Sequence, residues 1–96
     1  MANKQEVFSI TFAPGAVSAD ATADLPAGCP EIGSIIEAAL IASTIDTQVF
    51  AETALAPVID AADIASGKIS AVDGNTVRLG TAATTLMLLR VTYRVK

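Results

Sequence analysis

Hydrophobic and polar residues alternate with a period of two in several short stretches of this chain. In the first stretch, from Glu6 to Phe12, the apolar residues Phe8, Ile10 and Phe12 fall on one face. The opposite face carries Val7, Ser9 and Thr11. This pattern predicts a half-buried strand. The Ala13-Pro14-Gly15 sequence predicts its end, because proline cannot donate a hydrogen bond to a strand ladder.

The segment from Lys68 to Leu79 predicts a β-hairpin. Its apolar residues alternate with polar ones up to Asp73-Gly74-Asn75, and Val77 and Leu79 continue the alternation afterwards. Glycine and asparagine both tolerate the positive φ angles of tight hairpin turns. The same three residues resemble part of a calcium loop, but the remaining oxygen ligands of such a loop are missing. We therefore interpret them as a turn.

The last strand is predicted from Thr85 to Val95. One face would carry Met87, Leu89, Val91, Tyr93 and Val95, and the other Leu86, Leu88, Arg90, Thr92 and Arg94. The first half of this strand is thus apolar on both faces. We expect the tyrosine-bearing face to pack on the domain's own core. We expect Leu86 and Leu88 to be covered by another layer or another subunit.

Other stretches are more ambiguous. From Ile32 to Ser43 the apolar residues have helical spacing, but Gly33 and the β-branched Ile35-Ile36 weaken a helix. We favour a strand there and keep a helix as the alternative. A short strand is predicted from Ile45 to Phe50.

The stretch from Ala16 to Leu25 is compatible with a weak strand or an extended arm. The stretch from Val58 to Ser66 is compatible with a short helix, with Pro57 near its start and Gly67 after its end.

About six or seven short strands with frequent turns, and at most one short helix, predict a mainly β fold. We expect a compact antiparallel β-sandwich or barrel. Residues 1–96 would form a single β-rich domain, with residues 1–5 as a candidate N-terminal arm.

The composition is unusual for a free monomer. Hydrophobic residues make up 52% of the chain and charged residues only 17%, against a usual charged share of about 25%. So few charged residues cannot cover the whole surface of the domain. We therefore expect other subunits to cover part of that surface. The apolar run EIGSIIEAALIAS is interrupted by Glu31 and Glu37 and is shorter than the ~20 residues of a membrane span. We therefore expect no membrane association.

Charge is distributed unevenly along the chain. Residues 1–67 have a net charge of −8, and residues 68–96 have a net charge of +4. Either the two segments neutralise each other within one fold, or acidic and basic faces of neighbouring copies meet in an assembly. We expect no nucleic-acid partner, because few cations sit on a chain with a net charge of −4.

Residues that commonly carry catalysis are scarce. The chain has no histidine, which excludes histidine-dependent triads and the common zinc sites. Its single cysteine, Cys29, excludes an internal disulfide. We interpret Asp60 and Asp63 as solvated carboxylates rather than metal ligands. We therefore predict no catalytic residue, no cofactor, no metal site and no enzymatic activity.

Three segments together resemble the β-rich small virion proteins of tailed bacteriophages: VFSITFAPGAV, ATADLPAGCPEIGSII and GKISAVDGNTVRLGT with LMLLRVTYRVK. The matching features are the turn from Leu25 to Gly28 and the strand Val91-Thr92-Tyr93. The resemblance implies a virion structural protein of the capsid decoration (cement) type, assembled in the host cytoplasm. Its partners would be further copies of itself in a homo-oligomer, with a trimer as the expected state, and the major capsid protein or other virion proteins.

The candidate interface residues are Leu86, Leu88, Arg90 and Arg94. We expect the two arginines to meet acidic residues, either Glu31 or Glu37 of the same chain or those of a neighbour. The alternative function is a small β-sandwich that binds carbohydrate or peptide in an adhesion or host-recognition protein. That function predicts an exposed aromatic or polar groove.

Overall fold

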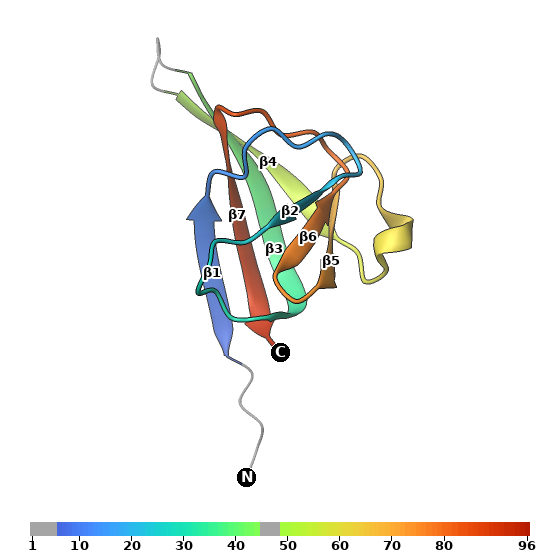
Figure 1. The fold of residues 1–96 in the computed structure, drawn as a ribbon. Coiled ribbons are helices and arrows are strands. Elements are labelled where there is room, and N and C mark those ends of the chain that lie inside the picture. Colours follow the sequence, from blue (N-terminus) through green and yellow to red (C-terminus); the bar gives the residue numbers. More distant parts are fainter. Residues whose placement is uncertain (1–5, 45–48) are drawn as a thin grey trace.

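A computed structural model of the protein describes residues 6–44 and 49–96. In these residues the chain forms seven strands and one 3-10 turn, which together make a curled half-barrel (Figure 1). The predicted mainly β fold with six or seven strands is confirmed. The elements are β1 (Val7–Phe12), β2 (Thr22–Asp24), β3 (Ile32–Thr44), β4 (Val49–Pro57), η1 (Ala61–Asp63), β5 (Lys68–Asp73), β6 (Thr76–Leu79) and β7 (Met87–Val95).

All seven strands belong to one sheet with the order β1-β7-β3-β4-β5-β6-β2. The first four strands form an antiparallel part, and β5, β6 and β2 fold over one side of it (Figure 1). The two parts join where β4 and β5 run parallel, at Ala56 and Pro57. An entirely antiparallel sheet was expected. Residues 58–67 return the chain so that β5 starts in the direction of β4, and such a parallel pair needs a longer connection than a hairpin turn.

The core lies between the two parts of the sheet. β7 supplies Leu89, Val91 and Tyr93 to it, all fully buried. Facing side chains from the other strands include Leu40, Leu55, Ile69, Val77 and Leu79. The predicted inward face of β7 is thus confirmed. In β1, Phe8, Ile10 and Phe12 are half-buried against this core while the alternate residues are exposed, as the sequence pattern predicts.

The ambiguous stretch from Ile32 onward is a strand, as favoured. β3 is central, with β7 on one side and β4 on the other. Its pairing with β7 is interrupted between Ile32 and Ser34 and again between Ile35 and Glu37. Each bulge inserts an extra residue and shifts the alternation by one. The bulges therefore explain why a strand carries apolar residues at a spacing that resembles a helix.

The short helix considered for residues 58–66 is reduced to the three-residue turn η1. The segment begins in extended form because the Val58 N–H donates to the Ile69 carbonyl at 2.9 Å and so continues the β4–β5 pairing. Asp60 then caps the turn by accepting from the Ala62 N–H at 2.9 Å.

The hairpin predicted from Lys68 to Leu79 is confirmed as β5 and β6. Gly74 begins its two-residue loop with a φ of +55°, a conformation that glycine adopts without steric cost. The stretch from Ala16 to Leu25 contributes only β2, together with a bridge between Val17 and Ala83.

Of the strand predicted from Ile45 to Phe50, residues 45–48 lie outside the described residues, and Val49 begins β4. No helix in the described ranges is long and apolar enough to span a membrane.

Candidate interaction surface

The four strands β1, β7, β3 and β4 present one face to the core and the other to the outside. Alternation along β7 places Leu88, Arg90, Thr92 and Arg94 on this outer face. The strand registers then add the following neighbours: Val7, Ser9 and Thr11 from β1, Glu37, Ala39 and Ile41 from β3, and Glu52 and Ala54 from β4. Most of these side chains are exposed or half-exposed. We call this surface the outer face.

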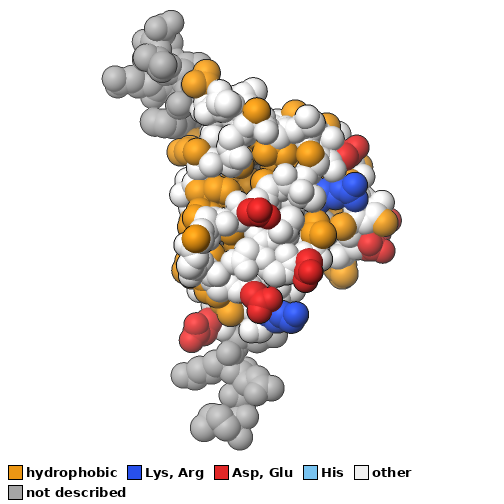
Figure 2. Space-filling view, viewed as in Figure 1, with side chains coloured by type: hydrophobic (Ala, Val, Ile, Leu, Met, Phe, Trp, Pro, Cys, Tyr) orange, Lys and Arg blue, Asp and Glu red, His pale blue; other side chains and the backbone are white. Residues whose placement is uncertain are grey.

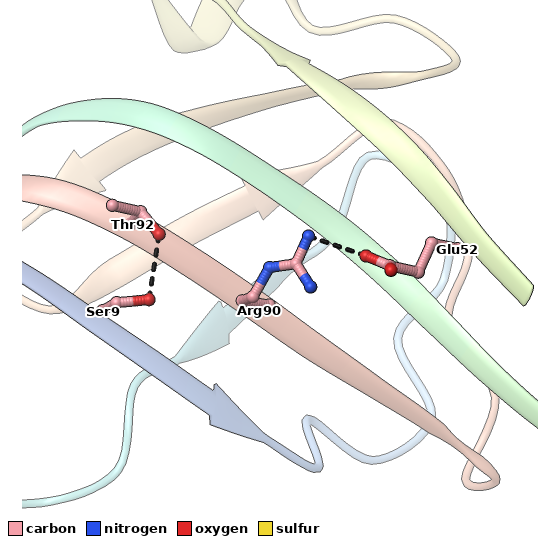
Figure 3. A network of polar contacts seen from close by, with 4 residues as sticks. All are labelled: Ser9, Glu52, Arg90 and Thr92. Carbon is pink, nitrogen blue, oxygen red and sulfur yellow. Dashed lines mark hydrogen bonds and ion pairs between the residues drawn. The ribbon is translucent and has the colours of Figure 1, made fainter. Parts of the chain in front are cut away.

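An ion pair crosses the middle of the outer face. Arg90 Nη2 lies 2.7 Å from Glu52 Oε1, so the arginine on β7 reaches across β3 to β4 (Figure 3). Ala39 of β3 lies opposite Arg90 and is only 3% exposed. Its small side chain leaves room for the arginine to extend over the strand. The side chains of the ion pair keep 34% and 52% of their surface accessible, so solvent screens the pair and its contribution to folding is small.

Within the chain, Arg90 pairs with Glu52 and with neither of the expected partners, Glu31 and Glu37. Glu37 lies opposite Thr92 rather than Arg90. Glu31 precedes β3 and lies near Gly74 of the β5–β6 turn. No local pattern points to Glu52, because its position opposite Ile41 depends on the register between β3 and β4.

A side-chain hydrogen bond joins β1 to β7 on the same surface. Ser9 Oγ and Thr92 Oγ1 are 2.9 Å apart (Figure 3). The centre of the outer face is thus polar and internally bonded. Apolar side chains lie toward its ends: Leu88 is 39% exposed near one end, and Val7 is 60% exposed near the other.

The structure brings three of the four candidate interface residues together. Leu88, Arg90 and Arg94 alternate along β7 on the outer face. Leu86 lies just before the strand and is 69% exposed. Neither leucine belongs to the buried core of the domain. Their role at an interface remains a prediction.

The opposite side of the molecule is acidic. Figure 2 shows acidic side chains spread over the face that carries β2 and β6, with few basic groups among them. The Arg78 guanidinium in β6 donates to two backbone carbonyls, from Nε to Asp20 at 2.8 Å and from Nη1 to Ala61 at 3.3 Å. In the described part of the chain, Arg90–Glu52 is the one ion pair between the acidic and the basic segments.

The sheet opens between β3 and β5, because β3 pairs with β4 only from Ala38 onward. The opening is closed at one end by the Ile32 N–H, which donates to the Gly74 carbonyl at 3.0 Å. Two adjoining hollows of about 230 and 250 Å³ lie here. Both are lined by Gly33, Ile59 and Ala71, and neither has an aromatic ring in its lining.

The described side chains that could in principle react, those of Tyr93 and Cys29, take part in structural contacts. The Tyr93 hydroxyl donates to the Pro30 carbonyl at 2.7 Å. Burial, and to a lesser extent the nearby Cys29 thiol, raises the pKa of Tyr93 above its ordinary value of 10.0. The described residues contain no group of three or more histidine, cysteine or acidic side chains that could hold a metal ion.

Sequence reasoning missed the role of Asn75. Its Nδ2 donates to the Cys29 carbonyl at 2.6 Å and to the Pro30 carbonyl at 3.3 Å. The β5–β6 turn is thereby fastened to the loop that precedes β3.

Comparison with known proteins gave no match to a family model, to a curated protein or to a solved structure. The likeness to small virion proteins therefore depends on the quoted segments alone.

Proposed function

We propose that this protein is a structural component of a tailed-bacteriophage virion, namely a capsid decoration (cement) protein. It stabilises the head by binding neighbouring virion subunits, and it catalyses no reaction. Its partners are further copies of the same chain and the major capsid protein. The observation that carries the proposal is the outer face, a β-sheet surface with exposed apolar residues and no covering layer among the described residues.

The chemistry of the outer face supports a protein partner. Its polar centre contains charges of both signs, and leucine and valine side chains remain accessible toward its ends. Aliphatic side chains beside complementary charges are typical of a protein–protein contact, in which apolar burial supplies affinity and charge fixes register.

The size of the outer face supports multiple contacts rather than one tight one. Four strands about 4.8 Å apart, with about 3.3 Å for each residue along a strand, give a flat area of about 570 Å² when β7 has nine residues. This is below the ~800 Å² that each partner buries in a standard stable complex. A single contact would be weak, but many copies on one shell act together, so opening the shell must break many contacts at once.

Exchanging the charges of the Arg90–Glu52 ion pair distinguishes an effect on binding from an effect on folding stability. Arg90→Glu places two carboxylates together, Glu52→Arg places two cations together, and the double variant restores a pair with reversed polarity. Because the pair is exposed, each single change costs at most ~1 kcal/mol of folding stability, and the double variant recovers most of it. All three variants are expected to lose binding, since each presents a reversed charge to the partner at one or both positions.

Binding is measured by co-sedimentation with phage heads prepared without this chain. Asp63→Arg serves as the matched control, because it makes the same change in charge as Glu52→Arg at an exposed position in η1 and should bind as the wild type does. If the double variant binds heads with wild-type affinity, the outer face is not the contact surface.

A further inference from the structure

We propose that β1 is a pairing edge that binds β1 of a second copy of this chain. The two strands run antiparallel about a two-fold axis at Ser9, so that the four-strand antiparallel parts (β1, β7, β3 and β4) of two copies form one continuous run of eight strands. This inference concerns the edge of the sheet rather than its outer face. Its failure would therefore leave the proposed binding to the capsid protein standing.

β1 ends the sheet, and half of its backbone groups have no backbone partner among residues 6–44 and 49–96. Val7 to Phe12 pair with β7 on one side only. The Val95 N–H donates to the Glu6 carbonyl at 2.8 Å. Since backbone groups alternate in direction along an antiparallel strand, those of Val7, Ser9 and Thr11 point away from β7. No backbone hydrogen bond in the described ranges uses these outward groups.

This edge lacks the features that normally prevent strands from pairing between molecules. Charged residues, proline, bulges and very short length are the usual protections of an edge strand. β1 has the sequence VFSITF, with no charge and no proline, and its register with β7 is unbroken over six residues. The other end of the sheet is protected, because β2 has only three residues and ends in Asp24.

The strand is also complementary to itself. In the antiparallel register centred on Ser9, Val7 lies opposite Thr11 of the second copy, and Ser9 lies opposite its counterpart. All three outward-facing residues of β1 then bond, forming about six backbone hydrogen bonds. On the core face, Phe8 lies opposite Ile10 of the second copy. Both side chains are only partly buried in the single chain, and the pairing covers them.

The pairing also enlarges the surface proposed to bind the capsid. A two-fold axis perpendicular to the sheet places both outer faces on the same side. The pair would therefore present a continuous surface of about twice the area of one chain. The expected unit is then a dimer, in contrast to the trimer that the virion resemblance implies.

Proline at position 9 tests the pairing directly. The Ser9 N–H points away from β7, so Ser9→Pro removes an edge donor without removing a backbone hydrogen bond inside the chain. Ser9→Ala is the matched control, because both variants lose the hydroxyl that contacts Thr92 and only the proline variant loses the N–H. Sedimentation equilibrium should show a dimer for the wild type and for Ser9→Ala. Dimerisation of Ser9→Pro should be at least about tenfold weaker, since two intermolecular bonds are lost.

Cysteine cross-linking provides a second readout and fixes the register. In a Cys29→Ala background, Ser9→Cys places two thiols on opposite Cα atoms about 5.5 Å apart, within disulfide range. Thr11→Cys places them more than about 10 Å apart along the strands. Under air oxidation, Ser9→Cys should form a covalent dimer much faster than Thr11→Cys.

Equal rates of cross-linking, unimpaired dimerisation of Ser9→Pro, or a wild type that remains a single chain would each overturn the proposal.

Discussion

The carbonyl of Pro30 is an acceptor shared by two side chains, and removing both donors should cost more stability than the two losses added together. Tyr93 reaches it from β7 with a 2.7 Å hydrogen bond, and Asn75 reaches it from the β5–β6 turn at 3.3 Å. Asn75 Nδ2 also donates to the Cys29 carbonyl at 2.6 Å. Three segments that are distant in sequence therefore meet at one loop.

Each single substitution should have a modest effect. Tyr93→Phe keeps the ring, which packs on Phe8 with centroids 5.7 Å apart, and removes only the hydroxyl. We expect a loss of about 1 kcal/mol, near the usual net value of a hydrogen bond, because Asn75 still serves the Pro30 carbonyl. Asn75→Ala should also cost about 1 kcal/mol, because the Cys29 carbonyl loses a donor while Tyr93 remains.

The double variant leaves the Pro30 carbonyl without either donor. A fully buried acceptor left unsatisfied costs about 1–3 kcal/mol. The Pro30 carbonyl is only partly buried, so the combined loss should exceed the sum of the single losses by about 0.5–1 kcal/mol. Urea denaturation followed by far-ultraviolet circular dichroism measures all four proteins. Each 1 kcal/mol should also lower Tm by about 4–8 °C in a domain of this size.

A second double-mutant cycle, built on Thr76 instead of Asn75, supplies the control. Thr76 adjoins Asn75 and bonds to Asp24 Oδ1 at 2.7 Å, so it does not share the Pro30 carbonyl. Thr76→Ala combined with Tyr93→Phe should be additive within about 0.5 kcal/mol. Additivity of Asn75→Ala with Tyr93→Phe to the same tolerance would refute the shared acceptor.

Two further predictions concern β3 and β7. Gly33→Ala should destabilise the fold by about 1–3 kcal/mol, because a Cβ there would lie 2.8 Å from the Arg94 carbonyl oxygen and 3.1 Å from the Lys96 Cα; the exposed neighbour Ser34→Ala should change stability by less than about 0.5 kcal/mol in the same urea assay. The raised pKa of Tyr93 should stabilise the fold fully below about pH 10, and this contribution should decline as the pH rises through the higher pKa of the folded state. Tyr93→Phe should lose less stability than the wild type over that alkaline range, and parallel pH profiles for the two proteins would contradict the assignment.

The local pattern of the sequence was sufficient for the strands that alternate without interruption. β1, β7 and the β5–β6 hairpin follow from the period of two, and so do the buried and exposed faces of β7. Periodicity alone could not decide β3, because its two bulges give a strand the apolar spacing of a helix. The sequence from 58 to 66 is compatible with a helix, but only the three-residue turn η1 forms there, since Val58 continues the pairing with β5.

The candidate surface was predictable in part. Alternation along β7 was enough to place Leu88 and the two arginines on one face. The partner of Arg90 depends on the register between β3 and β4, which is set by long-range pairing rather than by any local motif. The same reason applies to Asn75, whose acceptors lie more than 40 residues away in sequence. Local signals therefore predict which side chains share a face, but not which residues of distant strands they contact.

As a capsid decoration protein, the chain would be present in many copies, with part of its surface covered by other virion subunits. Quantitative mass spectrometry of purified particles from a phage that encodes the chain tests this most directly. We predict that the chain is present in many copies, at a fixed ratio to the major capsid protein that persists after extensive washing. Its absence from the particles, or its presence in trace amounts that washing removes, would contradict the account.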